Sequence, residues 1–107
     1  MSEFITVAQV GEIPERRGRA FTVGDRRVAV FCFDGTFYAL DDRCPHMGAS
    51  LATGDLRDGA VICDRHLWAF QLADGQCPDI PALRAETFEV RVEGREIQVR
   101  LPETTLR

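Results

Sequence analysis

Apolar and polar positions alternate along several short stretches of the chain, with the period of two that is typical of β-strands. Near the C-terminus, apolar residues recur at every second position on both sides of a Glu-Gly turn signal at residues 93–94. These residues are Phe88, Val90, Val92, Ile97, Val99 and Leu101. The pattern predicts a β-hairpin with one face towards the core and the other towards solvent.

A second hairpin is expected earlier in the chain. Residues 27–33 are rich in β-branched and aromatic side chains and end at Asp34-Gly35, a strong hairpin turn signal, after which residues 37–40 are the expected partner strand. Cys32 continues the alternation within the first of these strands, which predicts a buried core thiol.

Shorter strands are expected at residues 60–63 and 69–72, each next to an Asp-Gly turn signal. Residues 41–54 and 64–68 do not fit strand periodicity and are expected to be loops. The helical signal is limited to one turn at residues 11–17, which Pro14 interrupts. Many short strands joined by turns predict a single all-β domain, an antiparallel sandwich or small barrel over residues 1–107.

Composition supports a folded globular chain, with 45% apolar and 28% charged residues. The apolar stretches are far shorter than the roughly 20 residues that cross a bilayer, and the N-terminus lacks the features of a secretory signal. We therefore expect no membrane contact and a cytoplasmic location. A net charge of −4 without a basic cluster argues against nucleic-acid binding.

Acidic residues gather in and beside the segment 41–66, which would favour basic partner surfaces unless they are merely solvated loop residues. They are Asp41, Asp42, Asp55, Asp58 and Asp64.

The chemistry of the chain is concentrated in two Cys-His pairs, Cys44 with His46 and Cys63 with His66, which use both histidines of the sequence. Two thiolates and two imidazoles can hold either a tetrahedral zinc ion or a [2Fe–2S] cluster with two His ligands. Zinc fingers place both cysteines before both histidines, whereas each pair here contains one of each. The spacing favours the cluster over a zinc-stabilised structural module or unrelated buried cysteines.

The run Cys44-Pro45-His46 with Gly48, followed by Cys63 and His66, resembles the Rieske family. The resemblance implies that the two cysteines bind the buried iron and the two histidines the exposed iron. It also implies an antiparallel β-sandwich with a small cluster-binding subdomain, at about residues 41–82, built from two loops.

When the chain is matched to the family in this way, it differs from high-potential Rieske proteins at two pairs of positions. Ala49 and Arg65 stand where those proteins carry a pair of disulfide-forming cysteines, and Trp68 and Phe70 stand where they place Ser and Tyr hydrogen-bond donors. With fewer donors to the cluster, we expect a potential near the low end of the Rieske range, around −150 mV.

The run His66-Leu67-Trp68 resembles the ferredoxin component of multicomponent toluene-type diiron monooxygenases, which act in aromatic hydrocarbon catabolism. This implies a soluble, monomeric electron carrier between a flavin-containing NAD(P)H reductase and a terminal oxygenase. Ferredoxins of ring-hydroxylating dioxygenases and the small subunit of assimilatory nitrite reductase share the rest of the pattern and stay open as alternatives. Catalysis by the chain is not expected, because both histidines serve as ligands.

Three other residues beside the ligands are candidates for cluster shielding or partner contact. Trp68 could offer a flat apolar docking surface or pack beneath the loop, and Met47 and Pro81 could cover the cluster or serve loop geometry. Cys77 lies just before Pro78 in the expected covering loop and is interpreted as a structural thiol.

Overall fold

The computed structural model describes residues 3–44, 49–63 and 68–101. The described residues form nine strands and one short 3-10 helix, with no α-helix among them. In chain order they are β1 (Phe4–Gln9), β2 (Arg17–Val23), β3 (Arg26–Phe33), β4 (Thr36–Asp41), η1 (Leu51–Thr53), β5 (Asp55–Arg57), β6 (Ala60–Ile62), β7 (Ala69–Gln71), β8 (Thr87–Glu93) and β9 (Glu96–Arg100). The described part of the chain contains no helix long and apolar enough to span a bilayer.

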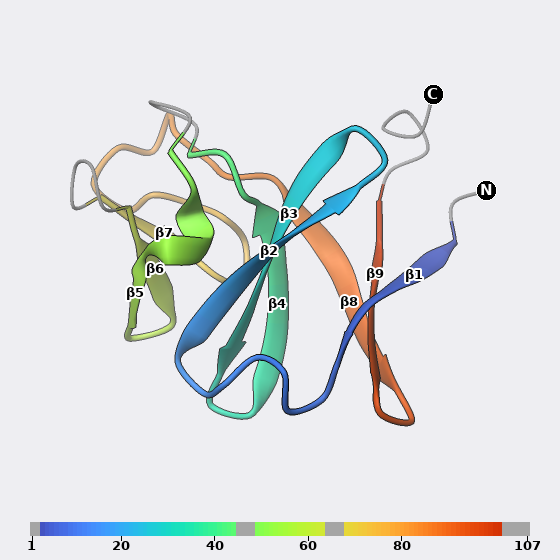
Figure 1. Cartoon of the computed structure of the whole chain (residues 1–107). Helices are drawn as coiled ribbons and strands as arrows, with labels where there is room; N and C mark the ends of the chain where they lie inside the picture. Colours follow the sequence, from blue (N-terminus) through green and yellow to red (C-terminus); the bar gives the residue numbers. More distant parts are fainter. Residues whose placement is uncertain (1–2, 45–48, 64–67, 102–107) are drawn as a thin grey trace.

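The strands form two antiparallel sheets (Figure 1). The larger sheet has the order β1-β9-β8-β4-β3-β2, and the smaller one has the order β5-β6-β7. β4 and β8 are paired through only two residue pairs, Ala39 with Phe88 and Leu40 with Thr87. The larger sheet therefore bends at this junction, and its two halves enclose apolar side chains between them. The expected all-β antiparallel architecture is confirmed.

Two apolar cores lie on opposite faces of β3. Val28, Val30 and Cys32 face the first core, which is shared with β1, β8 and β9, while Ala29 and Phe31 face the second core. The second core lies between the larger sheet and the small β5-β6-β7 sheet. Because β3 is covered on both faces, neither face is exposed to solvent, and all five of these residues are at most 7% exposed.

Two of the three Asp-Gly signals form tight hairpin turns, the first of them as expected. Asp34 and Gly35 have φ values of 54° and 77°, and Asp58 and Gly59 have values of 51° and 78°. Consecutive positive φ angles match the right-handed twist of the flanking strands, and Gly accepts them without steric cost.

The turn between β3 and β4 is held by a carboxylate from another part of the chain. Glu15 accepts hydrogen bonds from the backbone N–H groups of Asp34 and Gly35 and from the thiol of Cys32. The two backbone donors lower the pKa of Glu15. Burial, followed by the nearby Glu15 carboxylate, raises the pKa of Cys32. Cys32 is therefore a protonated, buried thiol, which confirms its interpretation as a core residue. Residues 11–16 form turns and bends rather than a helix, and Arg17 begins β2.

Candidate functional site

The structure brings the two candidate thiolate ligands into one core. Cys44 follows β4 and Cys63 follows β6, yet both have 0% exposure and both belong to the apolar core beneath the small sheet. Leu51, Phe70 and Leu72 are buried in the same core. A thiolate held there is screened from water, as a buried metal ligand requires.

Each cysteine also closes the base of its loop. The backbone N–H of Cys44 donates to the carbonyl oxygen of Ala49 at 2.8 Å, and the N–H of Cys63 donates to the carbonyl oxygen of Trp68 at 2.9 Å. His46 and Met47 lie within the first interval and His66 lies within the second, so these three candidates fall outside the described residues.

The segment after β7 lies against the same core. The N–H of Cys77 donates to the carbonyl oxygen of Leu83 at 3.2 Å, and Ile80 and Leu83 pack on the core. Pro81 is exposed, and its carbonyl oxygen accepts a hydrogen bond from Nε2 of Gln76 at 2.9 Å. The Pro81 backbone thus takes part in the loop geometry, while the residue as a whole is exposed.

Trp68 is half-buried and packs against the core that contains Cys44 and Cys63. Contact with this core therefore accounts for the partial burial of Trp68. Phe70 is fully buried in the same core and supplies no hydrogen-bond donor.

All four cysteines are in the described part of the chain, and these four form no disulfide with one another. Cys77 is fully buried in the same core as Cys44 and Cys63. Within residues 3–44, 49–63 and 68–101, no group of three His, Cys, Asp or Glu side chains converges in a way that could hold a metal ion. Among these residues, Cys77 thus does not complete a three-residue metal-binding group with Cys44 and Cys63.

The structure changes the expected role of two acidic residues. Asp41 forms an ion pair with Arg26 at 2.7 Å, and Asp42 contacts Nε of Arg27 at 3.3 Å. Arg26 also contacts Glu86 at 2.5 Å. Neither Asp41 nor Asp42 is thus an unpaired charge that could attract a basic partner, because each is matched within the chain.

Asp42 was missed as a functional candidate by sequence reasoning. It is the one charged side chain that is buried among the described residues, at 3% exposure. The sequence carries a partial signal, since Asp42 lies two residues before Cys44, but its burial depends on partners distant in the sequence.

The family model of the Rieske [2Fe-2S] domain matches residues 3–100. The chain belongs to the Rieske family. The buried pair of cysteines fits this family, because two sulfur donors from two separate loops are half of the ligand set of a Rieske-type [2Fe–2S] cluster.

Two relatives of similar length are ferredoxin components of oxygenase systems. The ferredoxin component of the alkene monooxygenase system of Xanthobacter autotrophicus is 32% identical over 98 residues, which is 91% of this chain and 80% of that protein. The ferredoxin subunit of the 3-phenylpropionate/cinnamic acid dioxygenase of Escherichia coli is 38% identical over 102 residues, or 92% of this chain and 94% of that protein.

Solved structures agree with the fold and with these relatives. A chain assigned as the small subunit of an NADH-dependent nitrite reductase from Mycobacterium tuberculosis superposes with a TM-score of 0.89 and 26% identity, covering 95% of this chain and 97% of that chain. A chain from the complex of reduced oxygenase and oxidised ferredoxin in carbazole 1,9a-dioxygenase superposes with a TM-score of 0.81 and 30% identity, covering 89% and 99% of the two chains.

Proposed function

We propose that this chain is a Rieske ferredoxin that carries single electrons from an NAD(P)H-dependent flavin reductase to a terminal oxygenase. The observation that carries the proposal is the convergence of Cys44 and Cys63 in one dry core, in a chain that matches oxygenase ferredoxins over nearly its whole length. We further propose that it works as a monomer in the cytoplasm, where reduced nicotinamide cofactors are available.

The proposed ligand set is Cys44 and Cys63 on the buried iron and His46 and His66 on the exposed iron. The burial of both cysteines supports the first half of this set. When bound, the cluster supplies one-electron redox chemistry at a potential raised by its neutral imidazole ligands. The cysteine side of the site excludes water, which leaves the histidine side as the route for the electron.

The histidines and the core residues of the chain fit electron transfer without catalysis. The two histidines of the sequence are both assigned to the cluster, which leaves none for acid–base chemistry or for a mononuclear iron triad. The described core around the cysteines is apolar, with Phe70 and Leu72 in place of substrate-binding polar groups.

A potential near the low end of the Rieske range, around −150 mV, is part of the proposal. Hydrogen bonds to cluster sulfur raise the potential, and the fully buried Phe70 offers none. A measured potential far above this value would show that other donors reach the cluster.

The terminal partner is proposed to be a diiron monooxygenase, with a ring-hydroxylating dioxygenase as the alternative oxygenase. The alkene monooxygenase ferredoxin supports the first and the cinnamic acid dioxygenase ferredoxin supports the second. We propose Pro81 as a partner contact because it is exposed in the segment that packs against the core.

A second candidate function is the small subunit of a nitrite reductase. It is favoured by the superposition on the M. tuberculosis chain, whose TM-score of 0.89 exceeds that of the carbazole dioxygenase ferredoxin. Copurification at a fixed stoichiometry with a large sirohaem protein would favour this candidate. A freely exchanging monomer would favour the oxygenase ferredoxin.

The central test is anaerobic purification followed by metal and sulfide analysis and EPR spectroscopy of the dithionite-reduced protein. We expect two irons, two sulfides and a Rieske-type EPR signal in the wild type. Cys44→Ser should abolish the colour, whereas Cys77→Ser, which changes a buried cysteine outside the ligand set, should retain it. One zinc without sulfide, or a cluster with sulfur ligands alone, would refute the proposal.

A further inference from the structure

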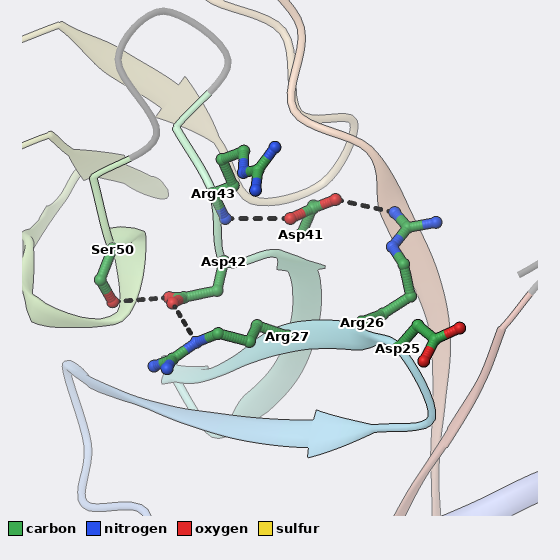
Figure 2. A pocket seen from close by; sticks show the side chains of 7 residues that line it. All are labelled: Asp25, Arg26, Arg27, Asp41, Asp42, Arg43 and Ser50. Atoms are coloured by element: carbon green, nitrogen blue, oxygen red, sulfur yellow. Dashed lines mark hydrogen bonds and ion pairs between the residues drawn. The ribbon is translucent and has the colours of Figure 1, made fainter.

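The carboxylate of Asp42 accepts three hydrogen bonds from two parts of the fold, and two of the three are drawn in Figure 2. Its Oδ1 accepts from Oγ of Ser50 at 2.8 Å and from the backbone N–H of Ala52 at 2.9 Å. Its Oδ2 accepts from Nε of Arg27 on β3 at 3.3 Å. Figure 2 shows the Ser50 and Arg27 contacts, which reach the carboxylate from two different segments of the chain.

The backbone of Asp42 makes two more contacts in the same place. Its N–H donates to the carbonyl oxygen of Arg27 at 2.9 Å, and its carbonyl oxygen accepts from the N–H of Leu51 at 2.7 Å. Arg43 and Ser50 form an antiparallel bridge directly beyond this point. Asp42 lies just before Cys44 and is bonded to residues 50–52, which follow the first loop. It is also bonded to Arg27 on β3, so it links both ends of the loop to this strand.

The cost of burying a charge favours one geometry for the Asp42 carboxylate. A carboxylate at 3% exposure is costly to bury unless its oxygens are satisfied, and here both oxygens are. Because the two Oδ1 donors come from residues after the loop, the carboxylate fixes the distance between the two ends of the loop. Satisfied buried networks of this kind hold one geometry.

The neighbouring Asp41 makes no such link across the loop. Its Oδ1 accepts from the N–H of Arg43, the next residue but one, and its Oδ2 pairs with Arg26. Asp41 is also half-exposed, whereas Asp42 is buried. The two adjacent carboxylates thus provide a natural comparison between a surface ion pair and a buried loop clamp.

We propose that Asp42 is a positioning residue for the cluster: its carboxylate clamps the two ends of the first ligand loop and thereby holds Cys44 where it binds the buried iron. This inference rests on the proposed function, since it assumes that Cys44 is a ligand. The essential property is the acceptor geometry of Oδ1 towards Ser50 and Ala52. The Arg27 contact contributes less, because its side chain is 63% exposed and therefore solvated.

The test uses the holoprotein and follows the bleaching of visible absorbance in the presence of an iron chelator, with EPR g values and thermal unfolding as parallel readouts. Asp42→Ala removes all three side-chain contacts and should accelerate cluster loss by roughly tenfold or more and shift the g values. Asp42→Asn retains an oxygen acceptor for Ser50 and Ala52, so it should restore both the g values and a loss rate within about threefold of the wild type.

Two further variants keep the test informative if Asp42→Ala does not fold. Ser50→Ala removes one donor to Oδ1 and should accelerate cluster loss by about threefold to tenfold. Asp41→Asn is the matched control on the adjacent residue and should leave the loss rate within about twofold.

The inference is overturned if Ser50→Ala and folded Asp42→Ala lose the cluster no faster than Asp41→Asn and share its g values. It is equally overturned if Asp42→Asn is as damaging as Asp42→Ala, since charge rather than acceptor geometry would then be essential. A coloured wild type with either result leaves the proposed function intact, whereas a wild type without iron and sulfide overturns both proposals.

Discussion

Gly54→Ala is expected to disturb the candidate site without touching a ligand. Gly54 connects η1 to β5 and has an ordinary backbone φ of −77°, so alanine can adopt its conformation. The obstacle is space, because an added Cβ would lie 2.2 Å from the carbonyl oxygen of Ile62 and 3.0 Å from Cγ2 of Val61. Ile62 is the residue immediately before Cys63.

The expected loss of stability follows from the 2.2 Å separation between the added Cβ and the carbonyl oxygen of Ile62. A carbon and an oxygen need about 3.2 Å, so the backbone around Ile62 must move by about 1 Å, and a backbone atom cannot move aside as a flexible side chain can. Overpacking of this kind costs about 1–3 kcal/mol, and the lower chain entropy of alanine in the unfolded state returns about 0.4–1 kcal/mol. A net loss of about 1–2 kcal/mol corresponds to a fall in Tm of about 5–10 °C for a chain of this size.

The control is Gly59→Ala, at the opposite end of the β5-β6 hairpin. Gly59 has a φ of 78° and open space around its Cα, so alanine there is strained but displaces nothing. We expect a comparable loss of stability, about 1–2 kcal/mol. Thermal unfolding and EPR of both holoproteins separate the two mechanisms, because only Gly54→Ala should alter the g values and the midpoint potential. Unchanged cluster properties in Gly54→Ala, or equal changes in both variants, would refute the reasoning.

Two other predictions concern stability. The folded-state pKa of Glu15 lies below its ordinary value of 4.5, so the stability that Glu15 contributes is present above that pH and is lost as the pH falls through the lowered pKa. The difference in urea midpoint between wild type and Glu15→Gln should therefore be largest at neutral pH and shrink on acidification, while the control Glu93→Gln should show no such trend. Phe70→Ala should cost about 3–5 kcal/mol because the ring is fully buried beside both cysteines. The control Val92→Ala, at a side chain 45% exposed, should cost about 0.5 kcal/mol or less, and similar denaturation midpoints for the two would contradict the assigned core.

The hairpins of this fold can be predicted from the sequence because their signals are local. Asp34-Gly35 and Asp58-Gly59 specify tight turns, and the flanking alternation specifies strands. β1 and β2 were missed because their support is not local. β1 pairs with β9 at the other end of the chain, and β2 places Arg17, Gly18 and Arg19 in an edge strand whose one paired neighbour in the sheet is β3.

The short strand β5 and the helix η1 were also missed, since both fall in or beside a segment that was expected to be a loop. η1 is buried through Leu51 alone, and β5 through Leu56 alone. A single apolar residue creates no periodicity. Both elements exist because the core beneath the small sheet provides a place for these side chains, and this information is carried by the rest of the chain.

In the candidate site, too, some features have a local sequence signal and others depend on residues far apart in the chain. The cysteines are identified by type and spacing, and their burial in one core agrees with that identification. The role of Asp42 could not be predicted, because a carboxylate beside a loop is solvated in most proteins and is buried only where donors converge on it. Its donors, from Arg27, Ser50 and Ala52, converge only once β3 lies beside the ends of the loop.

This burial also bears on how a partner is recognised. Arg26, Arg27, Asp41, Asp42 and Glu86 neutralise one another almost completely, leaving one net negative charge on this face of the molecule. The other three net negative charges of the overall −4 lie elsewhere, and at physiological salt such charges act over only about 8 Å. Long-range attraction from this face is therefore weak, so recognition depends on short-range contact with whatever surface surrounds the cluster. The exposed Pro81 and the half-buried Trp68 are two described residues that can provide such contact.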